Sequence, residues 1–139
     1  MRIEIIQDKN KLSPLQETLD NEVSAAFPNY DGIVDIFYTR NPTYFGAFED
    51  NHLIGVATIS GTIDNTCELY KLYISPTHRN RGYGESLLRH VLDEIKRSEV
   101  NRVCVEISGS SLSFWKKIVT IFQLDVDVIP PKNFIIKLS

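Results

Sequence analysis

The chain has 139 residues, of which 42% are hydrophobic and 24% are charged. That length and composition predict a single domain over residues 1–139 with its own hydrophobic core, and they exclude a disordered chain. The formal net charge of −3 excludes a globally basic nucleic-acid-binding protein. No apolar run approaches about 18 residues and the charged N-terminus does not resemble a signal peptide, so we expect no membrane association and a cytoplasmic location.

The cysteines and histidines do not form a disulfide framework or a metal site. The two cysteines, Cys67 and Cys104, are too few to cross-link a small fold, and both fall in predicted strands. The three histidines are isolated and lack the spacing of metal ligands. We therefore expect no bound metal and a reducing setting inside the cell.

Strand and helix patterns alternate along the chain. In chain order they predict a strand at 2–7, a helix at 12–27, a hairpin of strands at 44–48 and 53–60, a strand at 67–75, a helix at 84–97, a strand at 102–107, a short helix at 111–118 and two strands at 121–128 and 134–138. Ser13 suits the N-cap of the first helix and Pro14 its first position. Residues 33–39 leave helix and strand both open. The fold class is therefore α/β or α+β.

Residues 79–84 read R-N-R-G-Y-G and stand between a predicted strand and a predicted helix. Gly82 and Gly84 lack a Cβ, so the backbone can turn sharply there and approach a ligand closely. The helix points its free N–H groups and positive dipole end at this loop, and Arg79 and Arg81 add charge. Such a site suits a phosphate. The loop is neither a P-loop nor a G-x-G-x-x-G fingerprint, and a helix cap with ordinary surface arginines is the alternative.

Three stretches together carry a resemblance to a known family. They are E-L-Y-K-L-Y-I-S-P at 68–76, R-x-x-G-x-G at 79–84 with Leu87 and Leu88 in the helix that follows, and S-L-S-F-W-K-K at 111–117. In this order and separation they resemble the GNAT superfamily of N-acetyltransferases, whose later helix is usually written A-x-x-F-Y-x-K. The resemblance implies a GNAT-like mixed, splayed sheet of about six to seven strands flanked by about four helices.

The resemblance also implies how a donor is held. Acetyl-CoA is expected where the strands at 67–75 and 101–108 separate. Its pantetheine arm then lies along the first of these strands, and its pyrophosphate lies on the amides of the glycine-bearing loop. The implied cofactor-binding residues are Leu72, Tyr73, Ile74, Arg79, Asn80, Arg81, Gly82, Tyr83, Gly84, Glu85, Ser86, Trp115 and Lys117.

Acetyl transfer to an amine needs a neutral amine and a group that accepts its proton. Glu68 and Glu106 are the candidates, because both are carboxylates in otherwise apolar strands. The family motif reaches Glu68 directly and so favours it. Trp115 stands where many relatives have the tyrosine that protonates the departing thiolate, and an indole cannot act as an acid near neutral pH. Tyr70 is the candidate to replace that tyrosine.

The predicted function is therefore transfer of an acetyl group from acetyl-CoA to a primary amine by direct attack in a ternary complex. The unusual Trp115 also keeps open a second function, an acyl-CoA-binding regulatory or sensor domain with little or no turnover. A third possibility is a binding domain for another phosphorylated ligand. The final strands allow pairing in a homodimer.

The charge distribution bears on the acceptor. Residues 12–39 contain five acids and no Lys or Arg, whereas the remainder has 13 acids and 15 bases. Since the acidic segment flanks the acceptor side in this family, we expect a cationic amine bound by Tyr30, Asp31 and Asp35. A solvated acidic helix face is the alternative.

Overall fold

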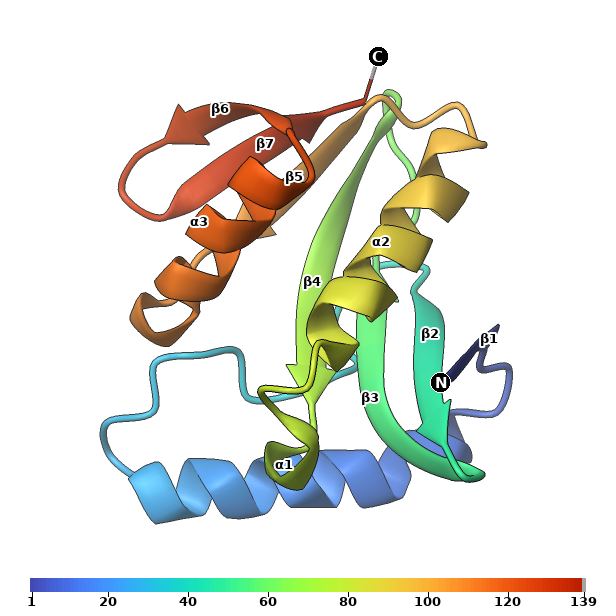
Figure 1. Cartoon of the computed structure of the whole chain (residues 1–139), viewed down its shortest axis with the longest axis vertical. Coiled ribbons are helices and arrows are strands. Elements are labelled where there is room, and N and C mark those ends of the chain that lie inside the picture. The colour runs from blue at the N-terminus through green and yellow to red at the C-terminus, as the bar shows by residue number, and fades with distance from the viewer. Residues whose placement is uncertain (139) are drawn as a thin grey trace.

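A computed structural model describes residues 1–138 and shows one mixed sheet of seven strands with three α-helices in that part of the chain (Figure 1). The strand order is β1-β2-β3-β4-β5-β7-β6. The strands are β1 (Arg2–Ile5), β2 (Thr43–Glu49), β3 (His52–Ile59), β4 (Thr66–Ile74), β5 (Arg102–Glu106), β6 (Asp125–Ile129) and β7 (Asn133–Lys137). The helices are α1 (Ser13–Ala26), α2 (Tyr83–Lys96) and α3 (Leu112–Ile121), with 3₁₀ turns at Lys9–Leu12, Pro76–His78 and Gly109–Ser111.

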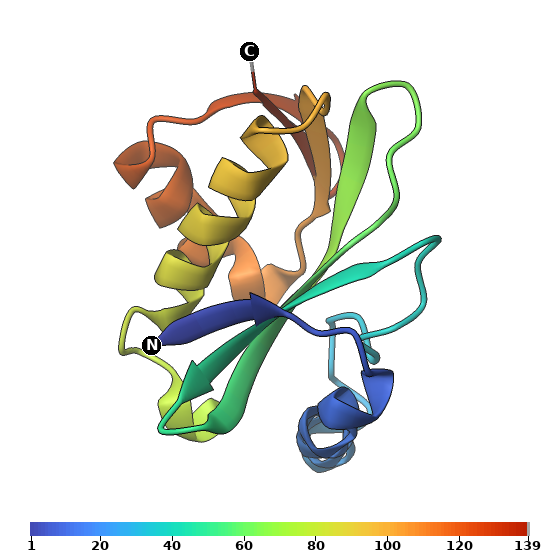
Figure 2. The same cartoon turned by 90° about the vertical axis from the view of Figure 1, so that its right-hand side faces the viewer.

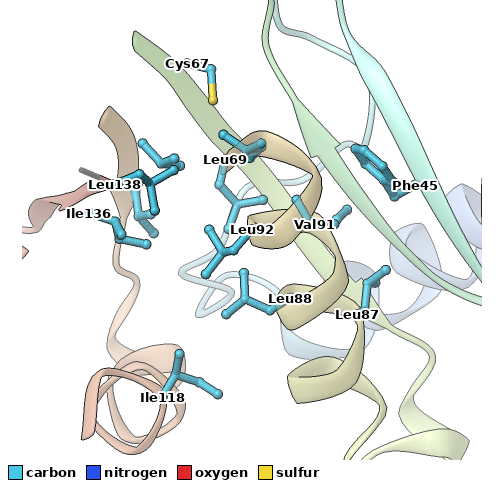
Figure 3. Packing of buried hydrophobic residues seen from close by; sticks show 14 of the residues in the cluster. Phe45, Cys67, Leu69, Leu87, Leu88, Val91, Leu92, Ile118, Ile136 and Leu138 are labelled. Atoms are coloured by element: carbon cyan, nitrogen blue, oxygen red, sulfur yellow. The ribbon is translucent and has the colours of Figure 1, made fainter. Parts of the chain in front are cut away.

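Helices cover both faces of the sheet. α2 and α3 lie on one face and α1 lies across the other, as two perpendicular views show (Figure 2). Apolar residues recur along α2 at helical spacing, so they form one buried stripe: Leu87, Leu88, Val91, Leu92 and Ile95. Figure 3 shows Leu87, Leu88, Val91 and Leu92 of this stripe among buried side chains of the sheet and of α3. The main core therefore holds α2 against the sheet.

β4 and β5 separate partway along β4. The two strands are parallel and pair only as far as Leu69 and Val105. Beyond that point β4 keeps β3 on one side, whereas β5 continues beside β7 and leaves the other edge of β4 without a partner strand among residues 1–138. Tyr70 is an extra residue opposite β3, since the register shifts between Thr58 and Ile59. A β-bulge therefore lies where the strands diverge, and it bends β4 away from β5.

The predicted mixed sheet is confirmed, and so is the predicted order of strands along the chain. Three details are corrected. Ser13 is not the N-cap of α1: Leu12 occupies that position without a side-chain cap, because a 3₁₀ turn runs directly into the helix. Residues 33–39 form neither helix nor strand, so the described chain has three α-helices rather than about four. The strand predicted at 121–128 begins only at Asp125, because α3 extends to Ile121.

Candidate active site

A cavity of about 240 Å³ lies in the opening between β4 and β5. Several side chains predicted from the sequence to be functional line it: Asp31, Tyr70, Leu72, Glu106 and Trp115. The other lining residues are Gly32, Ile33, Leu69, Lys71, Val105, Ser108, Ser111 and Lys132. The cavity therefore brings together parts that are far apart in the sequence: residues 31–33, β4, β5 and the start of α3.

The free edge of β4 can bind an extended ligand. From the bulge onward its backbone pairs, among residues 1–138, with β3 on one side only. Main-chain amides at such an edge can pair with the amides of a ligand as a further strand would. The predicted cofactor residues Leu72, Tyr73 and Ile74 belong to this part of β4. The geometry therefore fits an arm that carries amides, such as pantetheine.

The loop of residues 79–84 presents main-chain N–H groups at the start of α2. Asn80 has φ of 62° and Gly82 has φ of 81°, so the backbone is left-handed at two nearby positions. None of the N–H groups of residues 80–85 has a hydrogen-bond acceptor within residues 1–138. Together with the positive end of the helix dipole, they form an anion site. The predicted residues 80–85 thus provide donors suited to a diphosphate, whereas the N–H groups of Arg79 and Ser86, also predicted, already donate to the carbonyls of Pro76 and Gly82.

The side chain of Arg79 is directed elsewhere. Its guanidinium donates two hydrogen bonds to the carboxylate of Glu22 on α1, at 2.6 and 2.9 Å, and its Nε donates to the carbonyl of Ile74 at 2.9 Å. It also lies over the ring of Tyr73, 5.3 Å from the centroid. We predicted that the Arg79 side chain would add charge to the phosphate site. Its guanidinium instead links the loop to α1.

The three predicted catalytic residues have different surroundings. The hydroxyl of Tyr70 donates to Asp35 at 2.8 Å, and burial together with this bond raises the pKa of Tyr70, which makes it a poor acid. Glu106 lines the cavity and forms an ion pair with Lys132 at 3.1 Å. Glu68 does not line the cavity. It lies on β4 just before the bulge, and its carboxylate has no ion pair or hydrogen bond within residues 1–138.

Trp115 packs as a core residue at the edge of the cavity. It is 5% exposed and lies edge-on to Phe114 and Phe134, with ring centroids 5.3 and 5.2 Å apart. It fixes the start of α3 against β7. Lys117 is exposed and does not line the cavity.

The acceptor-side residues hold their own segment in place. Asp35 accepts hydrogen bonds from the N–H groups of Phe37 and Tyr38, both at 2.7 Å, in addition to the bond from Tyr70. Asp31 accepts from the main chain and hydroxyl of Ser110, before α3, at 3.3 and 3.1 Å. The segment that contains both carboxylates is thus tied to β4 and to the start of α3, and it closes one end of the opening.

Lys71 was not anticipated as a site residue. Its ammonium donates to the carbonyl of Ile33 at 2.6 Å and to the hydroxyl of Tyr30 at 3.3 Å. Burial lowers the pKa of this lysine from its usual 10.5 to about 8. The sequence does offer one signal, a lysine within a predicted strand. The main-chain carbonyl that accepts its hydrogen bond cannot be identified from a sequence pattern.

The shifted pKa of Lys71 predicts a pH dependence of stability. Between pH 8 and 10.5 the folded chain has released a proton that the unfolded chain still holds, so the free energy of unfolding rises with pH. Between about pH 7 and about pH 9.5, we expect the free energy of unfolding of the wild type to rise by about 1–2 kcal/mol relative to that of Lys71→Met. Urea denaturation of both proteins at the two pH values measures this gain. Unfolding free energies that change in parallel would contradict it.

Two classes of site are not found in the described part of the chain. Among residues 1–138, no cluster of three or more His, Cys, Asp or Glu side chains could hold a metal ion. No helix of the same residues has the length and apolar character needed to cross a membrane.

Known proteins share this sequence pattern and this fold. The pattern of the acetyltransferase (GNAT) family matches residues 10–118. A curated relative, the uncharacterized N-acetyltransferase YjgM of Escherichia coli, is 21% identical over 109 residues, which cover 76% of this chain and 63% of YjgM. The chain thus spans less than two thirds of that relative.

Solved structures of similar fold cover the whole chain. The PaiA N-acetyltransferase of Thermoplasma acidophilum, in complex with coenzyme A, has a TM-score of 0.66 at 20% identity, over 100% of this chain and 99% of its own. Tetrahymena GCN5 has a TM-score of 0.69 at 13% identity, over 100% and 97%. The family match extends over most of the chain and agrees with the splayed sheet. The chain therefore belongs to the acetyltransferase (GNAT) family.

Proposed function

We propose that this protein transfers an acetyl group from acetyl-CoA to a primary amine by direct attack in a ternary complex. One observation carries the proposal: within residues 1–138, a strand edge without a partner is followed by six main-chain N–H groups without acceptors, at residues 80–85. The first feature suits the amides of pantetheine and the second suits its diphosphate. The cavity at the bulge then leaves room for the thioester and the acceptor.

The reaction exchanges a thioester for an amide. The amine nitrogen attacks the carbonyl carbon, a C–N bond forms, and the C–S bond breaks with its electrons on sulfur. Main-chain N–H groups on the free edge of β4 stabilise the negative charge on the carbonyl oxygen. Neither Trp115 nor Tyr70 supplies an acid, because the first is an indole and the second is held by Asp35. The thiolate therefore leaves without a dedicated acid and takes its proton from solvent.

We assign the proton acceptor to Glu68, acting through a water molecule. Glu68 lies next to the bulge and its carboxylate is not ion-paired within residues 1–138, so its charge is available for a proton. Glu106 is the second candidate because it lines the cavity. Its carboxylate is already engaged in the ion pair with Lys132 at 3.1 Å, so Glu68 is preferred.

The acceptor we propose is a cationic amine that approaches past the acidic segment of residues 12–39. A panel of polyamines, amino acids, aminoglycosides and peptide N-termini, incubated with acetyl-CoA, tests both the reaction and this preference through the release of free thiol. We expect release above the buffer rate with cationic members of the panel. Binding of CoA without thiol release from any acceptor would instead favour a sensor domain.

A further inference from the structure

Glu22 connects two elements that meet at the start of the donor-binding loop. This α1 carboxylate accepts two hydrogen bonds from Arg79, at 2.6 and 2.9 Å, and one from the hydroxyl of Tyr73 at 2.9 Å. Arg79 is the first residue of the loop, and Tyr73 belongs to the free part of β4. One carboxylate therefore binds both the strand expected to carry the pantetheine and the loop expected to carry the diphosphate.

The pair is better defined than an ordinary surface ion pair. The side chains of Arg79 and Glu22 are only 39% and 27% exposed, and two guanidinium nitrogens donate to the two carboxylate oxygens. The Arg79 side chain lowers the pKa of Glu22, while Glu22 raises the pKa of Arg79. The third bond of the guanidinium, to Ile74, fixes it against the end of β4. Both ends of the link are thus held in one geometry.

The loop needs such an anchor from outside. Its N–H groups from residue 80 to residue 85 have no acceptors within residues 1–138, so they do not stabilise the loop's own conformation. Asn80 has φ of 62°, in the left-handed region that asparagine tolerates, so the backbone turns at the start of the loop. The hydrogen bonds of the Arg79 side chain therefore hold the loop, in place of main-chain hydrogen bonds within it. They are accepted by the carboxylate of Glu22 on α1 and by the carbonyl of Ile74 at the end of β4.

We propose that Glu22 is a positioning residue for donor binding, which acts through Arg79 to hold residues 79–84 with their N–H groups directed at the diphosphate. The inference rests on the proposed function, because it takes acetyl-CoA as the ligand. It assigns the Arg79 side chain to the loop's anchor rather than to the phosphates. Glu22 thus lies on α1, in the acidic segment of residues 12–39, and belongs to none of the motifs that predicted the donor site.

The test measures donor binding and turnover in Glu22→Gln. We expect the Kd for CoA and the KM for acetyl-CoA to rise about tenfold, with kcat at saturation unchanged. Arg79→Gln should have the same effect, and the double variant should be no worse than either single one, because both act through one link. Glu17→Gln, an exposed acid on the same helix, is the matched control and should bind CoA as the wild type does.

A donor without a diphosphate separates positioning from general damage. With S-acetylpantetheine, Glu22→Gln should keep the kcat/KM of the wild type, because this donor does not use the loop and the glutamine amide oxygen can still accept the hydrogen bond from Tyr73. Equal loss with both donors would overturn the proposal, as would unchanged or tighter CoA binding by Glu22→Gln, which would mean that a released Arg79 binds phosphate. Failure of the wild type itself to bind CoA would refute the proposed function instead.

Discussion

Replacing Glu68 with glutamine should lower kcat/KM for the amine about 100-fold near neutral pH. A positioned proton acceptor contributes about 10²–10⁴-fold to such reactions, and glutamine keeps the size of the side chain while removing its basicity. The loss should shrink as the pH rises, because more of the acceptor is then already neutral and needs no base. A pH–rate profile of both proteins at saturating acetyl-CoA measures this.

Glu106→Gln is the matched comparison for Glu68→Gln. It removes the other candidate proton acceptor and releases Lys132, yet it should lower kcat/KM less than tenfold if Glu68 is the base. A loss with Glu68→Gln that stays constant across pH would indicate a structural role for Glu68. A larger, pH-dependent loss with Glu106→Gln would transfer the assignment to the carboxylate that lines the cavity.

The second large effect is expected at Gly82. Its φ of 81° is a left-handed conformation that costs a side chain about 1–2 kcal/mol, and more when the side chain is β-branched. Gly82→Val should therefore shift the loop and weaken the hydrogen bonds that its N–H groups make to the diphosphate, each worth about 1.5–3 kcal/mol. Together these terms predict that the Kd for CoA rises about 100-fold by calorimetry.

Gly82→Asn is the control for that variant. Asparagine tolerates the left-handed region, and a Cβ built at Gly82 meets no atom within 4 Å, so the chain itself has room for the new side chain. Near-normal CoA binding by Gly82→Asn, with loss in a folded Gly82→Val, would show that backbone conformation is what matters. Unchanged affinity in a folded Gly82→Val protein would contradict the cofactor site.

The local parts of the fold and site were predictable from sequence. The stripe of α2 follows from apolar spacing, and the anion loop follows from two glycines between a strand and a helix. Trp115 was set aside as an acid on chemistry alone, because an indole N–H is not acidic near neutral pH in any surroundings. The hairpin of β2 and β3 was also found, since its turn residues Asp50 and Asn51 favour the left-handed backbone that they adopt.

The parts that depend on contacts across the chain were not predictable. Arg79 looked like a phosphate ligand because nothing in the sequence shows that Glu22, 57 positions away, would bind it. Tyr70 was taken as a candidate acid because its hydrogen bond to Asp35 was not predictable. Asp35 belongs to a segment without regular structure, whose position relative to β4 no sequence pattern gives. The bulge at Tyr70 depends on register with β3, which a strand pattern does not specify.

The most direct test of the central claim is a crystal structure with acetyl-CoA bound. We predict that the pantetheine arm lies along residues 72–74 of β4, with diphosphate oxygens within hydrogen-bond distance of the N–H groups of residues 80–85 and the thioester in the cavity beside Tyr70. A donor bound away from the opening between β4 and β5, or with its diphosphate away from residues 80–85, would contradict the proposed site and the reaction built on it.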